Sequence, residues 1–308
     1  MSAALAANAA SQRASNTLLR RVADSLSARI GLGIVLLVIA VALCAPILAP
    51  FDPLAIDLAH KLQPPGGQFL LGTDQAGRDL ASRIIWGSRH SIVISLSSIV
   101  IGCLFGITLG LVAGTLSGTL AEMVIMRFFD LIFSIPTLVW SIAIIGIIGT
   151  GALKVGPFEL DNQVKLIALI GASFIPALGR ITYSVALVEA KSDYVRVKKS
   201  LGAGWMEIAC IEILPNVLPP ALIQATLYMG VAIILEASLS FVGLGVQPPT
   251  PSWGTMLSDA RTFIFSGQWW LPVFPGLAIC VAVIGFNILG DGLRDALDPK
   301  SRATSTLV

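Results

Sequence analysis

The sequence predicts an all-α polytopic membrane protein with six transmembrane helices. The chain has 308 residues, of which 55% are hydrophobic and only 12% are charged. A soluble domain carries about 25% charged residues. Its mean hydropathy is +0.85, and the apolar residues gather in six long runs separated by charged segments. These observations exclude an ordinary soluble globule.

Each of the six runs is long enough to cross a bilayer. A helix needs about 20 residues without stranded charges to cross the hydrocarbon, because an unpaired ion there is costly. Arg180 is the only charged residue inside the runs, and it lies close enough to one end for its side chain to reach the interface. The runs are Ile30–Leu48, Ser91–Ala121, Leu131–Leu153, Leu166–Val188, Ile213–Leu235 and Thr262–Gly290.

The distribution of Lys and Arg predicts an N-in, C-in orientation. With both termini in the cytoplasm, the inner segments hold twelve Lys and Arg residues and the outer segments hold seven. We interpret the first run as an uncleaved anchor, because it is preceded by about thirty residues and reaches spanning length. The predicted organisation is a cytoplasmic tail over 1–29, a first transmembrane helix over 30–49, an outer loop over 50–90, a core of five helices over 91–295 with a cytoplasmic loop at 189–216, and a cytoplasmic tail over 296–308.

The chain contains no complete nucleotide-binding or metal-binding motif. Gly72 and Gly77 have the spacing of a phosphate-binding loop, but Arg78 and Asp79 stand where Lys and Ser or Thr are needed. The four cysteines and two histidines are too widely spaced for a metal cluster. A net charge of +2 is too small to indicate nucleic-acid binding. We therefore expect a non-enzymatic chain with no cofactor of its own.

Glu236 is the one isolated acid within the apolar part of the chain, directly after the fifth run. An acid at such a position can serve as a proton relay, which would make the chain a secondary transporter with Glu236 as its ion-coupling group. The alternative is a structural carboxyl group that is hydrogen-bonded between helices. We favour the structural interpretation, and the secondary transporter stays as the weaker alternative for function.

The cytoplasmic loop at 189–216 contains two helical patterns that meet at a glycine. Tyr194, Val197 and Leu201 share one helix face, and the segment Gly202–Gly204, which includes Ala203, can supply the turn that ends the helix. A second short helix then leads through Leu214 and Pro215 into the next span. An amphipathic helix of this kind suits docking into the groove of a partner protein, and the alternative is a connector that rests on lipid headgroups.

Four stretches of the sequence resemble the integral membrane permeases of ABC importers, in the dipeptide/oligopeptide/nickel branch and its second, C-type subunit. They occur in the expected order, and the resemblance runs from about residue 30 to 300. The chain departs from the general pattern of importer permeases at one position, where Arg196-Val197-Lys198 replaces Glu-Ala-Ala. The stretches are Leu71–Ser91, Asp193–Asn216, Leu239–Gly254 and Phe286–Pro299.

This resemblance implies a type I importer permease in a bacterial inner membrane. The implied partners are a homologous permease, two cytoplasmic ATPases that bind ATP and magnesium, and a periplasmic substrate-binding protein. The implied cargo is a di- or oligopeptide, with nickel chelates, glutathione, opines and sugars as alternatives. The residues that the resemblance assigns to the ATPase-coupling loop are Tyr194, Val197, Leu201, Gly202, Ala203, Gly204, Leu214 and Pro215.

The outer loop carries a block of alternating charges before the second span. These residues are predicted to form a paired plug that orients the second span or contacts the binding protein. The alternative is a solvated charged loop, which is ordinary at protein surfaces. The residues of this periplasmic block are Asp74, Gly77, Arg78, Asp79, Arg83 and Arg89.

Overall fold

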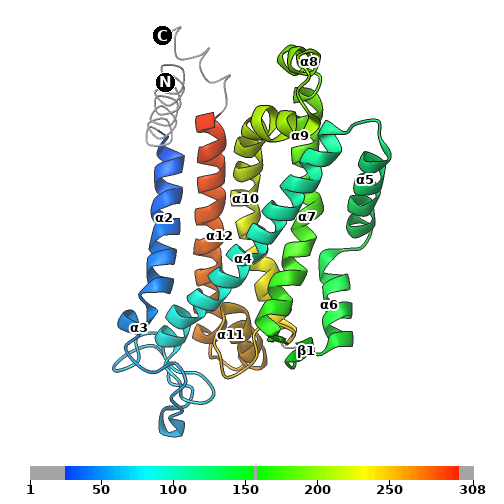
Figure 1. The fold of residues 1–308 in the computed structure, drawn as a ribbon. Helices are drawn as coiled ribbons and strands as arrows, with labels where there is room; N and C mark the ends of the chain where they lie inside the picture. Colours follow the sequence, from blue (N-terminus) through cyan, green and yellow to red (C-terminus); the bar gives the residue numbers. More distant parts are fainter. Residues whose placement is uncertain (1–24, 156–157, 298–308) are drawn as a thin grey trace.

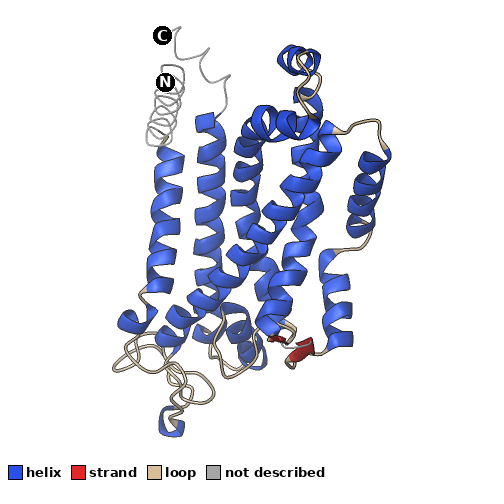
Figure 2. Cartoon of the chain, in the orientation of Figure 1, coloured by secondary structure: helices blue, strands red, loops and turns tan. Residues whose placement is uncertain are grey.

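The computed structural model describes residues 25–155 and 158–297, and within them the chain is a bundle of long helices (Figure 1, Figure 2). The predicted tails over 1–29 and 296–308 lie almost entirely outside the described residues. The elements in chain order are α2 (Leu26–Leu43), α3 (Ala45–Leu48), the 3-10 turn η1 (Leu58–His60), α4 (Leu80–Thr115), α5 (Leu120–Phe133), α6 (Thr137–Ile148), β1 (Leu153–Val155), β2 (Phe158–Leu160), α7 (Asn162–Glu189), α8 (Asp193–Ser200), α9 (Trp205–Glu207), the π-helix η2 (Ile208–Ile213), α10 (Leu214–Phe241), α11 (Trp253–Ala260), the 3-10 turn η3 (Arg261–Phe263) and α12 (Trp270–Leu297).

Five described helices are long and apolar enough to cross a membrane, and the bent pair α5–α6 gives a sixth when it is counted as one span. The start of α2, the end of α12 and α8 lie at one end of the bundle, whereas α3, α11 and β1 lie at the other (Figure 1). The prediction of six spans is thus confirmed, with the third one broken. The only strands in the described part of the chain, β1 and β2, form a small antiparallel hairpin that was not predicted.

The prediction of a continuous third span over Leu131–Leu153 is wrong. The span begins earlier, at Leu120, and breaks after Phe133, where α5 and α6 meet at an angle of 83°. Pro136 explains the break, because its ring lacks a backbone N–H and disfavours a helical conformation at the residue before it. As a result, Glu122, Arg127 and Asp130, which precede the apolar run, are part of this span.

The predicted outer loop over 50–90 is also too long at its C-terminal end. α4 begins at Leu80, with Asp79 as its N-cap, so that Arg83 and Arg89 belong to the helix. The sequence did not indicate this boundary, because charged residues next to an apolar run are typical of a loop. In the structure the helix extends beyond the apolar run, and the ion pairs of Arg83 stabilise the extension.

Glycines set the spacing of the two central helices, α4 and α7. Gly102, Gly106, Gly110 and Gly114 follow one another at every fourth position along α4 and face α7. A Cβ atom at Gly110 would lie 2.3 Å from the carbonyl oxygen of Gly179, so the two backbones are in direct contact. Without a hydrophobic driving force between helices in lipid, such close packing holds them together.

The first span is attached to the last one in the same way. A Cβ atom at Gly31 of α2 would lie 2.3 Å from the backbone nitrogen of Leu289 in α12, and one at Gly292 would lie 2.3 Å from that of Ala28. α10 completes the centre of the bundle, where its buried residues join those of α4, α7 and α12 in one apolar cluster. α5 and α6 lie at the edge of the bundle beside α7 (Figure 1).

Candidate functional site

The helix α8 projects beyond the bundle, and local interactions define both of its ends (Figure 1). Asp193 lies in its first turn and Lys198 and Lys199 lie in its last turn, which suits the helix dipole. The helix ends in a paired turn: the N–H of Ala203 donates to the Lys198 carbonyl at 3.1 Å, and that of Gly202 donates to the Lys199 carbonyl at 3.0 Å. Gly202 has a φ of +86°, a conformation that favours glycine. The predicted turn at Gly202 is therefore present.

A single buried side chain anchors α8 to the bundle. Val195 is fully buried in a cluster with Ile208, Ala209 and Ile213, and Ala203 packs against the same cluster. The sequence pattern did not identify Val195, because the periodicity of the helix indicates which residues share a face but not which face points inward. Val195 lies on a different side of the helix from Val197 and Leu201, which are exposed.

Polar contacts also tie α8 to its neighbours. The Lys198 ammonium lies 2.8 Å from the Glu212 carboxylate, and this hydrogen bond raises the pKa of Lys198. The Tyr194 hydroxyl donates to Glu189 at 2.5 Å and accepts from the Asn216 amide at 3.2 Å. Burial raises the pKa of Tyr194, and its hydrogen bond to Glu189 raises it further. Both donors therefore keep their protons at neutral pH, and both ties persist there.

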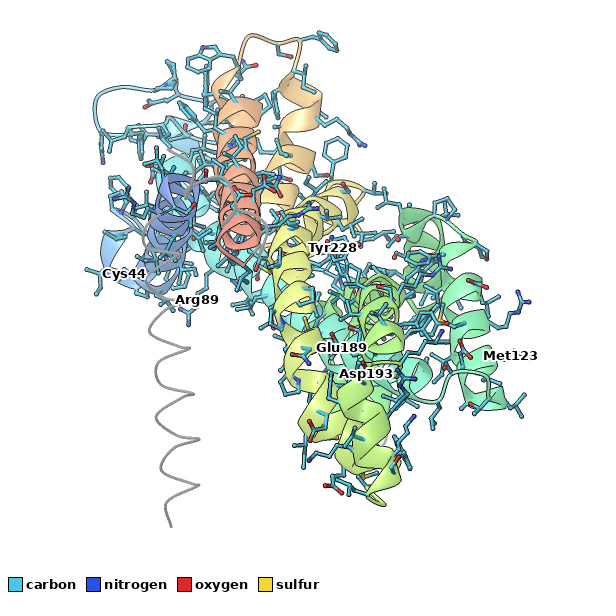
Figure 3. The ribbon with its side chains drawn as sticks, turned by 90° about the horizontal axis from the view of Figure 1, so that it is seen from above. Cys44, Arg89, Met123, Glu189, Asp193 and Tyr228 are labelled. Atoms are coloured by element: carbon cyan, nitrogen blue, oxygen red, sulfur yellow. The ribbon has the colours of Figure 1, made fainter. Side chains whose placement is uncertain are left out.

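The opposite face of α8 has no partner within the described chain. Val197 is 58% exposed and Leu201 is 78% exposed, and Trp205 and Met206 continue the apolar surface beyond the turn. Figure 3 views this end of the bundle, where Glu189 and Asp193 lie beside each other. The result is a helix that is firmly attached on one side and apolar on its free side. We call Val197 and Leu201, together with Trp205 and Met206 of α9, the free face of α8.

The segment after α8 joins it stiffly to the fifth span. Leu214 packs against the cluster that holds Val195, and Pro215 lies in the first turn of α10. Because Pro215 has no N–H to donate, the helical hydrogen bonding before it is irregular, and residues Ile208–Ile213 form a π-helix. The start of α10 therefore packs against the same buried cluster that anchors α8.

Replacing Gly202 by valine is expected to reduce transport by the assembled protein at least tenfold while membrane insertion persists. A Cβ atom at Gly202 would meet no neighbour, so the cost comes from the positive φ alone and amounts to about 1–3 kcal/mol. The matched control is Gly204→Val, because Gly204 has an ordinary extended φ of −72° and equally open surroundings. Equal uptake by the two variants would show that the turn geometry is unimportant.

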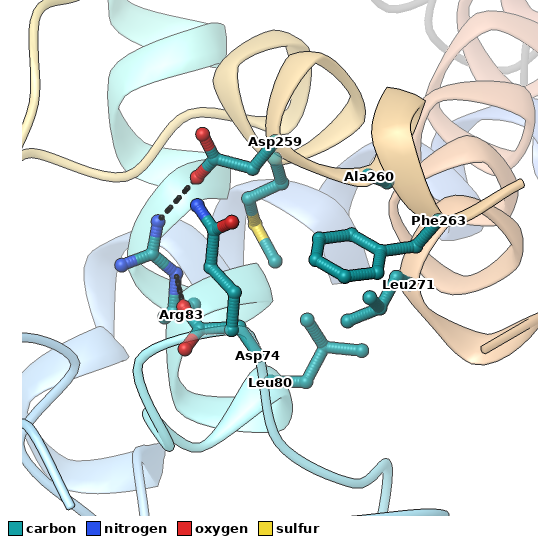
Figure 4. A pocket seen from close by; sticks show the side chains of 9 residues that line it. Asp74, Leu80, Arg83, Asp259, Ala260, Phe263 and Leu271 are labelled. Carbon is teal, nitrogen blue, oxygen red and sulfur yellow. Dashed lines mark ion pairs between the residues drawn. The ribbon is translucent and has the colours of Figure 1, made fainter. Parts of the chain in front are cut away.

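The outer block forms a paired cluster at the other end of the molecule (Figure 4). Asp74 accepts a hydrogen bond from Arg78 at 2.7 Å and lies 3.5 Å from Arg83. Both arginines also approach Asp259 of α11, at 3.9 Å from Arg78 and 3.6 Å from Arg83. Arg83 is only 3% exposed, so the cluster is an internal plug that joins the loop, α4 and α11, and not a solvated loop.

The remaining residues of the block have different roles. Asp79 caps α4 by accepting from the Ser82 N–H at 2.8 Å. Gly77 has a φ of +75°, and a Cβ atom there would lie 1.7 Å from the Asp57 carbonyl oxygen, so a side chain would not fit. Arg89 lies apart from the cluster, with its guanidinium 6.0 Å from the centre of the Trp86 ring.

Asp259 is the member of the cluster that the sequence did not indicate. It lies far from the block in the chain and reaches it only because α11 folds back beside α4. Burial raises the pKa of Asp259, and the charges of Arg83 and Arg78 act in the opposite direction. No local signal marks such a residue.

Replacing Arg83 by glutamine is expected to lower the stability of the purified protein by about 3 kcal/mol, because it leaves a buried carboxylate poorly paired. The measurement is the thermal unfolding midpoint in detergent. Arg89→Gln serves as the control, since Arg89 has the same charge, lies on the same helix and makes no ion pair within the described chain. Equal midpoints for the two variants would contradict the interpretation of the cluster as a plug.

Glu236 is fully buried in α10. One carboxyl oxygen accepts from the Ser240 hydroxyl at 2.8 Å, and the other has no hydrogen-bond partner in the described structure. A proton relay needs access to water, which a fully buried group lacks in this conformation. The geometry favours the structural interpretation of Glu236.

This arrangement of spans, with an anchored helix at one end and a charged cluster at the other, is that of a multi-pass membrane permease. The chain belongs to the family described as binding-protein-dependent transport system inner membrane component, whose model matches residues 106–303. A second model, the N-terminal TM domain of oligopeptide transport permease C, matches residues 18–65. The protein is accordingly a multi-pass protein of the inner membrane.

The relatives are permeases of similar length to this chain. The chain is 45% identical over 276 residues to a di/tripeptide transport system permease protein of Pseudomonas aeruginosa, with 88% of this chain and 87% of the relative covered. It is 40% identical over 268 residues to a probable D,D-dipeptide transport system permease protein of Escherichia coli, with 87% and 86% covered. The solved MetNI methionine ABC transporter shares the fold, with a TM-score of 0.54 at 19% identity, over 71% of this chain and 98% of that one.

Proposed function

We propose that this protein forms half of the translocation pathway of an ATP-driven importer for di- and oligopeptides. Its relatives at 40–45% identity are named as dipeptide or di/tripeptide permeases, which supports the peptide as substrate. A homologous permease supplies the other half of the pathway. A periplasmic binding protein delivers the peptide, and two cytoplasmic ATPases bind and hydrolyse ATP, so the chain needs no nucleotide of its own.

The free face of α8 is the observation that carries this proposal. Val195 and the Lys198–Glu212 pair hold the helix on the inner side, while Val197 and Leu201 present apolar surface to the cytoplasm. Apolar side chains at such positions are stable in a partner's groove, and a helix in a groove is a common recognition mode. A rigid attachment then converts movement of the ATPases into movement of α10 and opens or closes the pathway.

Uptake by the complete importer in proteoliposomes tests this function. We expect import of a radiolabelled dipeptide to require internal ATP and the external binding protein, and to persist when a protonophore collapses the proton gradient. Uptake that survives removal of ATP but stops with the protonophore would instead support a secondary transporter that depends on Glu236. Competition by glutathione, a nickel chelate, an opine or a sugar would reveal a different cargo for the same class of importer.

A further inference from the structure

Three charged residues lie at the depth where the third span is broken. Asp130 is ten residues from the start of α5, and Arg180 is nine residues from the end of α7. At about 1.5 Å per residue, Asp130 lies about 15 Å and Arg180 about 14 Å from these helix ends, so both lie within the spans. Arg180 turns to Asp130 and not, as expected from the sequence, to the interface. Asp130 forms an ion pair with Arg180, and Arg127 lies 3.6 Å from the same carboxylate.

These charged side chains are exposed on the surface of the isolated chain. Arg180 is 45% exposed, Asp130 is 46% exposed and Arg127 is 81% exposed. A charge that faces lipid at this depth is costly, and intramembrane charges usually face a water-filled cavity or another protein. The surface around the break is therefore not a lipid-facing surface.

The backbone at the break leads to the same conclusion independently of the charges. Residues 134–136 are not helical, and Ser134 and Ile135 are exposed. Irregular backbone does not occur against lipid, because its N–H and C=O groups would lack partners, and it is tolerated where it lines a cavity or is buried in protein. Discontinuous helices at mid-membrane depth are a frequent way to build a transport site.

A hollow opens on this surface beside the charged residues. It has a volume of about 510 Å³ and is lined by Glu122, Arg127, Asp130 and Tyr183, among others. Met123, which also lines the hollow, lies at the edge of the bundle, away from Tyr228 on α10 (Figure 3). Ligand sites typically have volumes of about 300–1,000 Å³, so a small peptide has room there.

The broken span is held in place by other contacts besides the central ion pair. At the cytoplasmic side, the Tyr183 hydroxyl donates to Glu122 at 2.5 Å. At the outer side, the Lys165 ammonium donates to the carbonyls of Gly149 and Gly151 at 2.5 and 2.6 Å. The Asp130–Arg180 pair is thus one of several contacts between the third span and α7. The span stays attached to α7 through the other contacts when this ion pair opens.

We propose that this surface lines the path of the substrate and that Asp130, Arg180 and Arg127 form a passage site for the charged ends of a peptide. The guanidinium groups pair with the terminal carboxylate, because arginine binds carboxylates through two parallel hydrogen bonds, and Asp130 pairs with the terminal ammonium. In the empty site Asp130 and Arg180 neutralise each other. A passing peptide must separate Asp130 from Arg180 before it pairs with both, and the cost of that separation limits its affinity and permits release.

This inference rests on the proposed function, and the ratio of ATP hydrolysed to peptide imported tests it. In the complete importer, with glycyl-phenylalanine as the probe, Arg180→Gln is expected to lower uptake at least tenfold. ATP hydrolysis stimulated by the loaded binding protein should stay within twofold of the unmodified importer. Lys165→Met is the matched control, because it removes another tie of the same span and should leave the ratio unchanged.

Three outcomes of that experiment would overturn the passage site. If Arg180→Gln lowers hydrolysis and uptake in proportion, or if Lys165→Met raises the ratio as much, the ion pair only stabilises the span. Unchanged uptake by Arg180→Gln would also contradict the site. If the unmodified importer carries no peptide at all, the proposed function fails, and the next measurement still tests whether this surface lines an aqueous path.

That measurement is the reactivity of a cysteine at the break. The four native cysteines are replaced by serine, and Ser134→Cys in the assembled importer is treated with a charged, membrane-impermeant methanethiosulfonate. Modification is expected to be at least tenfold faster than for Leu36→Cys on the exposed surface of α2, and to change when ATP is added. Equally slow modification of both positions would show that lipid or the partner permease covers the break.

Discussion

Replacing Gly110 by leucine is expected to prevent the protein from folding into its native bundle. The first atom of the new side chain would lie 2.3 Å from the Gly179 carbonyl oxygen and 2.8 Å from Thr182, and the rest of the side chain would force α4 and α7 apart. Overpacking of a core costs about 1–3 kcal/mol and sometimes more. Here the cost lies at the upper end, because the contact is between backbones that cannot change rotamer.

The yield of monodisperse protein in mild detergent measures this effect, and we expect it to fall more than tenfold. Gly33→Leu on α2 is the control, because a side chain at Gly33 meets nothing within 4 Å in the described structure. It makes the same chemical change inside another transmembrane helix and should leave the yield within twofold. A normal yield for Gly110→Leu would mean that the α4–α7 contact is looser than described here.

Replacing Leu201 by aspartate is expected to abolish transport without unfolding the protein. Leu201 is 78% exposed at the end of α8, so its substitution should change the free energy of unfolding by no more than about 0.5 kcal/mol. In a complex with the ATPases, however, the new carboxylate would be buried without a partner in an apolar groove. Such burial costs several kcal/mol, and the complex should dissociate.

Co-purification of the ATPases with the permease is the direct measurement for this variant, and uptake of the dipeptide is the second. We expect both to fall at least tenfold for Leu201→Asp. Leu201→Met keeps the volume and apolar character of the side chain and should retain both activities within twofold. Retention of the ATPases by the aspartate variant would mean that the free face of α8 is not their docking surface.

The two variants separate an effect on the fold from an effect on the complex with the ATPases. Gly110 acts within the chain and is needed for the fold, whereas Leu201 acts at the surface and is needed only in the complex. A chain that tolerates the first and not the second would still be a coupled permease with a more adaptable core. The opposite result would confirm the fold and remove the main support for the proposed coupling.

Several features followed directly from the sequence, because they depend on composition along the chain. The membrane class and the number of spans follow from the cost of burying charge in hydrocarbon, and the glycine turn at Gly202 follows from local conformation. The resemblance carried by Asp193–Asn216 predicts a coupling loop, and α8 and its glycine turn lie in this segment. Each of these depends on residues that are close together in the chain.

Other features depend on contacts that no local pattern encodes. The hydropathy of Leu131–Leu153 is continuous, so the break at Pro136 and the inclusion of Asp130 in a span became visible only in three dimensions. The glycines of α4 are spaced for close packing, but the sequence does not say that α7 is their partner. Asp259 joins the outer plug across a long stretch of chain.

The sequence by itself thus determined that this protein is a six-span permease with an amphipathic helix between its fourth and fifth spans. Only the tertiary structure decided which way that helix faces, with Val195 inward and Leu201 outward, and that Arg180 meets Asp130 at a broken span. The physical reason is that helical periodicity and hydrophobic burial act along the chain, whereas the orientation of a face and the pairing of distant charges depend on which helices become neighbours.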